Sequence, residues 1–305
     1  MVTGAGGFLG SAVVDLAVRQ GREVRAVVRD AARAAAVLPA GVDIAVADLA
    51  DQAALTAAAR GCSAVLHVAG AVAGSAEQTR ELNVAGTGRA LAAAVAAGVG
   101  RFVFTSSSAA VLDATGLVAD EPAGPPALTD AYSVSKAEAE QVVLAAARAG
   151  DIEAMVTNPV SIYGPSPRGP HSYNALFLAA ARGAEAAIVD SAVGWVLAED
   201  AAAGHLLVAD KGEPGRRYVL CGEVATFGWM LHAFADGVGG SRAATLPPGS
   251  TLPADAGTFA RRSEVYGHFP PVRVADANAR GLGFAPRGVA EGMALTAGWL
   301  ARRAR

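Results

Sequence analysis

Few residues in this sequence are of the kinds that mark disulfide-bonded, metal-binding or nucleic-acid-binding proteins. The 305 residues include two cysteines, Cys62 and Cys221, and five histidines, and none of these has the spacing of a metal site. A disulfide between the two cysteines cannot be argued from sequence, so we expect the reduced thiols of a cytoplasmic protein. The formal net charge of −3 provides no basic field for nucleic acid. We therefore expect no metal and no nucleic-acid partner.

Long apolar runs are also missing, although hydrophobic residues make up 52% of the chain. Alanine accounts for much of that share. Stretches such as Ala90 to Val99 contain glycine and lack the ~20 apolar residues that a membrane-spanning helix requires. The N-terminus has neither the basic nor the apolar region of a signal peptide. These absences predict a cytoplasmic protein with no membrane partner.

Lysine is scarce as well, because every Lys/Arg position except Lys136 and Lys211 holds arginine. Lysine is a compact point charge, whereas arginine is a planar fork, so a lysine kept in such a composition points to a chemical site. Lys136 follows Tyr132 by four residues, and residues at this spacing share one helical face. An ammonium beside a phenol stabilises its anion and lowers its pKa toward the range of a general acid. Alone, the pair is equally well read as a surface tyrosine near a surface lysine.

Short apolar runs alternate with helical patterns in the first half of the chain, which is typical of βαβ units and a parallel sheet. The predicted strands are Val24–Val28, Val42–Ala47, Ala64–Val68, Phe102–Thr105 and Glu153–Thr157. The predicted helices are Leu9–Arg19, Gln52–Ala59, Ala76–Ala97 and Ala131–Ala149. Asp51 and Asp130 are expected N-caps. The predicted fold class is α/β, a Rossmann-type doubly wound parallel sheet with a smaller C-terminal substrate-binding region.

The alternation of strand and helix patterns ends after Asn158-Pro159. The proline-rich segment from Gly164 to Pro170 predicts a loop that leads into a substrate-side region. Val193–Leu197 and Arg217–Leu220 are expected to return to the main sheet, and a helix is expected near Val289–Arg302. We thus expect a dinucleotide-binding domain over 1–160, joined by 193–221, and a substrate-binding region over 161–192 and 222–305.

A glycine-rich turn opens the chain. Gly4, Gly7 and Gly10 lie where a strand gives way to a helix that begins with Phe8 and Leu9. Glycines at this spacing let a pyrophosphate approach main-chain N–H groups at a helix N-terminus. We expect the turn to bind a dinucleotide. Only residues 1–3 are present as the first strand, so either the start is set too far downstream or the strand is clipped.

The residues after the second strand bear on which dinucleotide is bound. Arg29 comes first, with Arg33 one turn later, and both could pair with a 2′-phosphate. Asp30 could instead take ribose hydroxyls and select NAD, but a cap for the next helix is the preferred interpretation. NADP(H) is therefore favoured, with NAD(H) as the alternative. Asp48-Leu49 resembles an adenine-contacting pair, and an ordinary turn explains it nearly as well.

The sequence contains three motifs in the order that one enzyme family shows, and together they are highly specific. They are Thr3-Gly4-x-x-Gly7-x-x-Gly10, Thr105-Ser106-Ser107 and Tyr132-x-x-x-Lys136. With them the chain resembles the extended short-chain dehydrogenase/reductases, the NAD(P)-dependent epimerase/dehydratase-like enzymes, over roughly Met1 to Gly222. Four segments are similar to the dihydroflavonol-reductase and cinnamoyl-CoA-reductase branch. They are Val24 to Asp30, Phe102 to Ser107, Tyr132 to Glu140 and Asn158 to Pro165.

The resemblance implies roles for individual residues. Tyr132 gives its proton to a substrate carbonyl oxygen as hydride arrives, and Ser107 donates a hydrogen bond to the same oxygen. Lys136 lowers the pKa of the tyrosine and holds the nicotinamide ribose. Asn83 has a structural or water-positioning role, the first being preferred. Pro159 and Val160 pack near the nicotinamide.

Other polar and aromatic residues are weaker candidates. His67 lies in a predicted strand and is expected to be a satisfied core residue, and His205 follows a segment that resembles the family's return to a helix. The residues that follow the proline loop could line a substrate pocket, as could two tryptophans for which core packing is the safer expectation. These residues are His171, Tyr173, Asn174, Trp195 and Trp229.

The leading functional hypothesis is an NADPH-dependent reductase of a ketone or aldehyde that also works in reverse as an alcohol dehydrogenase. A nucleotide-sugar epimerase or dehydratase and a 3β-hydroxysteroid-type dehydrogenase are alternatives. A non-catalytic NADP-binding regulator typically loses the tyrosine or the lysine, and this chain keeps both. The expected partner is a small carbonyl or alcohol substrate, and homodimers are common in the family. The sequence does not name the substrate.

Overall fold

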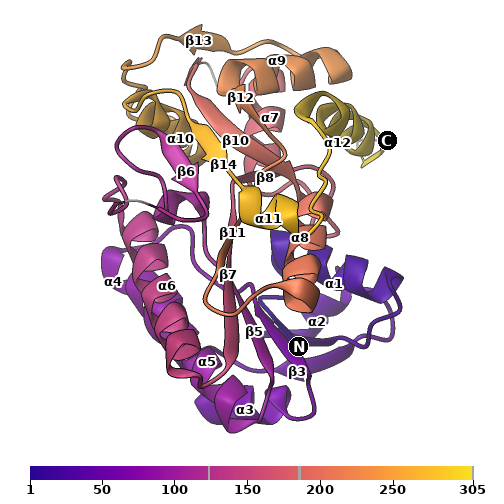
Figure 1. The fold of residues 1–305 in the computed structure, drawn as a ribbon. Coiled ribbons are helices and arrows are strands. Elements are labelled where there is room, and N and C mark those ends of the chain that lie inside the picture. The colour runs from indigo at the N-terminus through magenta and orange to yellow at the C-terminus, as the bar shows by residue number, and fades with distance from the viewer. Residues whose placement is uncertain (123, 185–186, 304–305) are drawn as a thin grey trace.

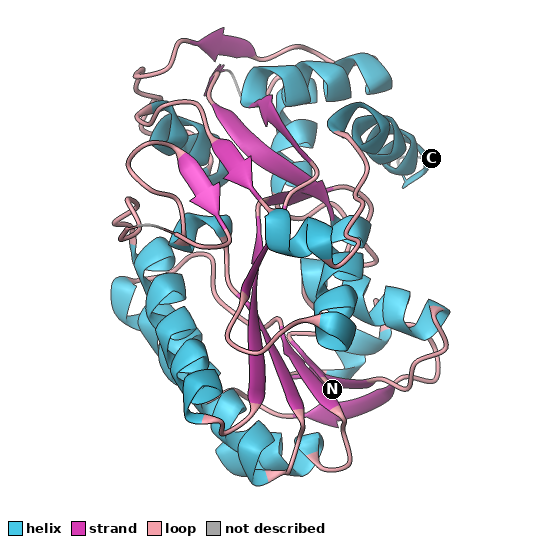
Figure 2. Cartoon of the chain, in the orientation of Figure 1, coloured by secondary structure: helices cyan, strands magenta, loops and turns pink. Residues whose placement is uncertain are grey.

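The main sheet has seven strands, all parallel. The structure is a computed structural model that describes residues 1–122, 124–184 and 187–303. The strand order is β11-β7-β5-β4-β1-β2-β3, which turns back at β1 as in dinucleotide-binding α/β folds (Figures 1 and 2). The strands are β1 (Val2–Thr3), β2 (Arg25–Val28), β3 (Asp43–Val46), β4 (Ala64–His67), β5 (Arg101–Thr105), β7 (Glu153–Pro159) and β11 (Arg217–Leu220). The predicted α/β fold class is confirmed.

Helices cover both faces of this sheet. One face carries α3 (Gln52–Ala59), α5 (Gly86–Ala96) and α6 (Ala131–Ala149), and the other carries α1 (Phe8–Arg19) and α8 (Ala198–Lys211) (Figure 1). The predicted helix Ala76–Ala97 consists of α4 (Ala76–Arg80), a π-helical turn at Glu81–Ala85 and α5. The short α2 (Ala31–Ala35) follows β2. Apolar side chains form one buried cluster on each side of the sheet, which is the arrangement that a parallel sheet requires.

The helix ends follow the expected capping chemistry. Asp51 accepts a hydrogen bond from the Ala54 amide at 2.9 Å, and Asp130 accepts one from the Ser133 amide at 3.2 Å. The short first strand has one further contact with β4, because the N-terminal ammonium of Met1 donates a hydrogen bond to the Ala64 carbonyl at 2.8 Å. Both expected N-caps are confirmed.

A second sheet stands above the first, in the order β12-β10-β8. Its strands are β8 (Ser161–Tyr163), β10 (Ala192–Leu197) and β12 (Glu223–Thr226). The expectation that Val193–Leu197 returns to the main sheet is wrong, because β10 pairs with β8 and β12. Every residue of that run is buried, so its apolar pattern equally suits a central strand of either sheet. Arg217–Leu220 does join the main sheet beside β7, as predicted. The domain boundaries as a whole stay a prediction.

The remaining elements form the upper half of the molecule (Figure 2). Its helices are α7 (Tyr173–Ala181), α9 (Phe227–Val238), α10 (Thr258–Gly267), α11 (Ala277–Gly281) and α12 (Val289–Arg303). Two small pairs of strands accompany them, β6 (Leu117–Ala119) with β14 (Arg273–Ala275) and β9 (Ala187–Val189) with β13 (Ala244–Leu246). Trp195 is fully buried in an aromatic core here, whereas Trp229 is 42% exposed and does not fit the core role expected of it. Among the described residues, no helix has the length and apolarity needed to cross a bilayer.

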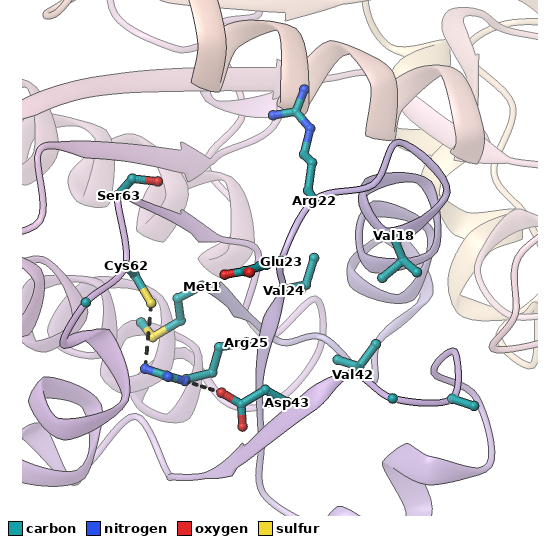
Figure 3. A pocket seen from close by; sticks show the side chains of 13 residues that line it. Met1, Val18, Arg22, Glu23, Val24, Arg25, Val42, Asp43, Cys62 and Ser63 are labelled. Atoms are coloured by element: carbon teal, nitrogen blue, oxygen red, sulfur yellow. Dashed lines mark hydrogen bonds and ion pairs between the residues drawn. The ribbon is translucent and has the colours of Figure 1, made fainter.

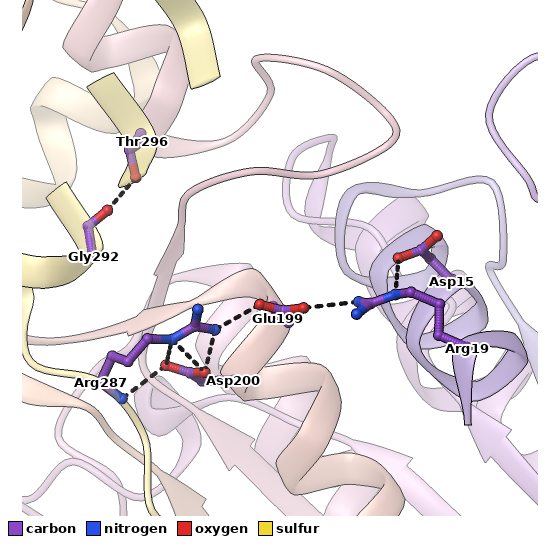
Figure 4. Close-up of polar contacts among 7 residues, drawn as sticks. All are labelled: Asp15, Arg19, Glu199, Asp200, Arg287, Gly292 and Thr296. Carbon is purple, nitrogen blue, oxygen red and sulfur yellow. Dashed lines mark hydrogen bonds and ion pairs between the residues drawn. The ribbon is translucent and has the colours of Figure 1, made fainter. Parts of the chain in front are cut away.

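Ion pairs tie α12 and its leading segment to the lower half. Arg287 binds Glu199 and Asp200 in the first turn of α8, and Glu199 also binds Arg19 of α1, which binds Asp15 (Figure 4). Acidic residues in the first turn of a helix are favoured by the positive end of its dipole. The network therefore fixes the C-terminal segment against the nucleotide-binding half.

Candidate active site

The residues predicted from sequence to act together lie where strands of the main sheet end. The glycine turn follows β1, Ser107 follows β5 and Pro159 ends β7, while Tyr132 lies in the first turn of α6. Ligands of open α/β sheets bind at the carboxyl ends of the strands, beside the point where the strand order turns back. The topology thus brings these four segments to one edge of the sheet.

The close packing of the turn after β1 requires glycine at two positions. A Cβ at Gly10 would lie 2.1 Å from the Gly4 carbonyl oxygen, and one at Gly4 would lie 2.7 Å from the backbone of Ala69. Gly4 also has φ of +65°, a conformation that L side chains rarely adopt. Gly7 begins α1 without a side-chain cap, which leaves the free amides of Phe8 and Leu9 at a positive helix end. These features fit the pyrophosphate of a dinucleotide.

Tyr132 and Ser107 are brought together from α6 and the turn after β5. Burial raises the pKa of the Tyr132 phenol above its ordinary value of 10.0, while its hydrogen bond with Ser107 and the charge of Arg262 oppose that rise. Ser106 instead has a buried hydroxyl without a hydrogen-bond partner among the described residues. The hydroxyl that meets the phenol is therefore that of Ser107.

Lys136 is buried one turn beyond Tyr132, with 4% of its surface exposed. Its Nζ donates to the main-chain oxygen of Thr105 at 2.8 Å and lies 4.9 Å from the centre of the Phe104 ring. Burial lowers the pKa of this ammonium to about 8. That Lys136 lowers the pKa of Tyr132 stays a prediction, while Arg262 is a cation that lowers it in this structure. A Cβ at Gly70 would lie 3.0 Å from Lys136 Nζ, so the loop after β4 packs closely against the ammonium and glycine is favoured there.

Asn83 has a structural role in this arrangement. Its side chain accepts a hydrogen bond from the Ala71 amide at 2.8 Å and donates to the Ala71 carbonyl at 3.0 Å. It also donates to Ser135 Oγ on α6 at 2.9 Å. The π-helical turn that carries Asn83 thus fixes the loop after β4 against the helix that bears Tyr132 and Lys136.

A second amide, Asn158 near the end of β7, supports the serine. Its Nδ2 donates to the Ser107 carbonyl at 3.0 Å and to the Glu140 carboxylate of α6 at 2.5 Å. Arg217 of β11 binds the other oxygen of Glu140 at 2.7 Å, so this buried carboxylate is compensated. Pro159 and Val160 follow directly, and their place beside the nicotinamide stays a prediction.

The residues expected at the adenosine end lie after β2 and β3. Asp30 accepts a hydrogen bond from the Arg33 amide at 3.0 Å, so it caps α2 as we expected. Arg29 and Arg33 are exposed beside it. Asp48 accepts from the Ala50 amide at 2.9 Å, which is the ordinary turn left open as the alternative for Asp48-Leu49.

Several weaker candidates have structural roles. Asn174 clamps Gly164 through both backbone groups, at 2.9 and 2.8 Å, so it does not line a pocket. His67 is fully buried between Thr3 and Thr87, and burial lowers its pKa to about 3, which confirms a core histidine. His205 is equally buried, and burial lowers its pKa to about 4. His171 is exposed.

Arg262 and Tyr266 of α10 were missed by the sequence reasoning. Arg262 lies 3.4 Å from Asp130, the N-cap of α6, and its guanidinium carbon lies 5.4 Å from the centre of the Tyr266 ring. The two belong to a segment without a recognised motif, more than a hundred residues beyond Tyr132. No local pattern could have found them.

A hollow of about 520 Å³ lies elsewhere, at the amino ends of β1, β2 and β3 (Figure 3). Arg25 lies in its wall and binds Asp43 at 2.6 Å. The glycine turn is at the opposite ends of these strands. None of the residues predicted to bind cofactor or substrate lines this hollow, so it is not the site.

Comparison with known proteins agrees with this geometry. Residues 1–221 match the NAD dependent epimerase/dehydratase family. Sterol demethylase protein B of Methylococcus capsulatus is 31% identical, over 99% of this chain and 98% of its own. A protein named as a dihydroflavonol 4-reductase in Synechocystis is 35% identical, over 72% of this chain and 66% of its own. The 2-alkyl-3-oxoalkanoate reductase of Stenotrophomonas maltophilia is 39% identical, over 54% of this chain and 51% of its own.

Solved structures share the whole fold. The crystal structure of gox2253 has a TM-score of 0.84 and 27% identity, covering 100% of this chain and 98% of that one. MoeE5, solved with UDP-glucuronic acid and NAD, has a TM-score of 0.80 and 25% identity, covering 99% and 98%. The resemblance to the dihydroflavonol-reductase branch is confirmed by the relatives. From its glycine turn, its strand order and the matched residues, this chain belongs to the NAD dependent epimerase/dehydratase family.

Proposed function

We propose that this chain is an NADPH-dependent reductase of a ketone or aldehyde, which also oxidises the corresponding alcohol. The observation that carries the proposal is the convergence of three side chains from two elements: Tyr132 interacts with Ser107, and the buried ammonium of Lys136 lies one helical turn beyond the tyrosine. A protonated phenol and a hydroxyl that face the same space can both donate to one carbonyl oxygen. The names of the reductase relatives support this reaction class.

The roles of the side chains follow from their protonation. A reduced nicotinamide, when bound, supplies the hydride. Because burial raises the pKa of Tyr132, the phenol keeps its proton at neutral pH and can give it to the oxygen that becomes an alkoxide. Ser107 stabilises the charge on that oxygen, and Asn158 fixes the serine through its carbonyl. The ammonium of Lys136, one helical turn from Tyr132, would hold the ribose hydroxyls of the cofactor.

The preference for NADP(H) rests on the end of β2. One carboxylate oxygen of Asp30 accepts the Arg33 amide at 3.0 Å, which supports its role as a helix cap over binding of the ribose hydroxyls of NAD. Arg29 and Arg33 offer exposed guanidinium groups, which suit a 2′-phosphate. In the double variant R29A/R33A, the affinity for NADPH should fall roughly 10- to 100-fold, with NADH affinity little changed. Equal losses for both cofactors would contradict the assignment.

Tyr132→Phe tests the reaction itself. Reduction of a panel of ketones with NADPH should fall by about 100-fold or more, because general acid catalysis is lost. NADPH binding, followed by fluorescence, should survive. Tyr218→Phe is a matched control, since that buried tyrosine lies in β11 and its hydroxyl accepts a hydrogen bond from the Glu213 amide at 2.7 Å. Full ketone reduction by Tyr132→Phe would overturn the mechanism.

A sterol-type substrate is favoured by one finding. The relative that spans 99% of this chain is named a sterol demethylase protein. Oxidation of a ring hydroxyl would use the same three side chains in reverse. Turnover of a UDP-sugar, without reduction of any ketone, would instead place the chain with the sugar epimerases and dehydratases of its fold.

A further inference from the structure

Arg262 reaches from the C-terminal region to the start of the helix that carries Tyr132. It lies on α10, and its Nη1 is 3.4 Å from Asp130 Oδ2, two residues before the tyrosine. The Arg262 side chain is mostly buried, with 20% of its surface exposed. Its charge acts on three phenols, those of Tyr132, Tyr173 and Tyr266. A cation from the C-terminal region is therefore held close to the proposed proton donor.

The guanidinium is loosely held by the protein. Its two hydrogen bonds, to Asp130 at 3.4 Å and to the Tyr266 hydroxyl at 3.5 Å, are both longer than the 2.7–2.9 Å typical of charged pairs. Asp130 is already engaged, since it accepts from the Ser133 amide at 3.2 Å and hydroxyl at 2.6 Å. A guanidinium has more donors than these two contacts use. An anion that enters the site would find donors available.

The surroundings of Arg262 also limit what carries that anion. Phe259, three residues earlier on the same helix, packs in a tilted arrangement against Tyr173, with ring centres 4.9 Å apart, and Tyr173 meets Trp195 edge-on at 5.0 Å. Apolar rings thus adjoin the cation. A small charged head on an apolar body suits such a site better than a polar sugar does.

We propose that the substrate is an oxo acid, whose carbonyl binds Tyr132 and Ser107 while a carboxylate one or two carbons away binds Arg262. This rests on the proposed reductase function and names its substrate class. The printed name of one relative, a 2-alkyl-3-oxoalkanoate reductase, describes the same juxtaposition of carbonyl and carboxylate. Arg262 thereby acts as a specificity-determining residue.

In the direction of alcohol oxidation, the C3–H bond of a 3-hydroxy acid breaks and its hydride reduces NADP⁺. The hydroxyl proton leaves through Tyr132, and the product is the 3-oxo acid. The carboxylate takes no part in the bond changes. Its contact with Arg262 orients C3 toward the cofactor.

The test compares 3-hydroxydecanoate with its methyl ester, which has the same alcohol without the charge. We expect wild type to oxidise the acid with the higher kcat/KM. In Arg262→Met, kcat/KM for the acid should fall roughly 10- to 100-fold, while that for the ester should change little. Arg262→Lys should recover part of the loss. Arg261→Met is the matched control, because Arg261 on the same helix is paired with Glu264 at 3.2 Å, and it should keep the wild-type preference.

The acid-to-ester ratio separates a direct contact from an indirect one. If Arg262 acted only through the fold or through Tyr132, the substitution would reduce both substrates equally, and the proposal would fail. Calorimetric binding of both probes to the NADP⁺-loaded Tyr132→Phe variant, with and without Arg262→Met, needs no turnover. The two proposals can fail separately. If acid binding requires Arg262 but the wild type is inactive on every carbonyl and alcohol tested, the contact is upheld and the reductase function is rejected. Equal binding of acid and ester would reject the contact.

Discussion

Replacing Lys136 with methionine should make the protein without cofactor more stable and nearly inactive. Burial lowers the pKa of the ammonium from 10.5 to about 8. At about 1.4 kcal/mol per pH unit, this difference corresponds to roughly 3 kcal/mol of unfolding free energy. Methionine removes that cost but leaves the Thr105 carbonyl without its donor at 2.8 Å, which costs about 1–3 kcal/mol. We expect a net gain of up to about 2 kcal/mol at pH 7.

The sign of the pH dependence gives the sharper test. Below about pH 8 the lysine is charged in both states, so the burial cost is fully present. As the pH rises from about 8 to 10.5, the folded state loses its proton before the unfolded state does, and wild type gains stability relative to Lys136→Met. Urea unfolding of both proteins without cofactor, at matched pH values, measures the difference. A difference that does not change over this range would refute the buried, charged lysine.

Three further predictions concern the turn, an acid and the ion-pair network. Gly10→Ala should abolish NADPH binding, because its Cβ would lie 2.1 Å from a backbone oxygen, whereas Gly88→Ala meets nothing within 4 Å and should bind normally in a fluorescence titration. Burial raises the pKa of Asp120 from 3.8 to about 6, so the unfolding free energy of wild type relative to Asp120→Asn should decrease by a few kcal/mol between pH 4 and 7; parallel pH profiles would contradict this. Arg287→Ala should lower the unfolding free energy by roughly 3 kcal/mol, because Asp200 is left unpaired. Arg19→Ala, whose side chain is 52% exposed, should cost less than about 1 kcal/mol in the same urea assay.

Local chemistry explains which predictions from the sequence succeeded. Asp130 was recognised as an N-cap because a cap depends on a side chain and an amide three residues away, and both are visible in the sequence. The strand Val193–Leu197 was recognised, but its sheet was wrong. A run that is buried on both faces carries no mark of its neighbours, and pairing with β8 and β12 depends on residues far along the chain. Arg262 was not predicted as a site residue for the same reason, since only the packing of α10 brings it to Asp130.

The sequence by itself determined the elements of the candidate site: a glycine turn after a first strand, a serine after another and a tyrosine–lysine pair at helical spacing. Each of these depends on short-range geometry, in which backbone sterics and the helical repeat leave few arrangements. The tertiary structure decided which charges act on that site. It places the ammonium of Lys136 against the Thr105 carbonyl and the guanidinium of Arg262 beside Asp130, two residues before the tyrosine. Electrostatic effects depend on burial and distance in space, and neither is written in the order of the residues.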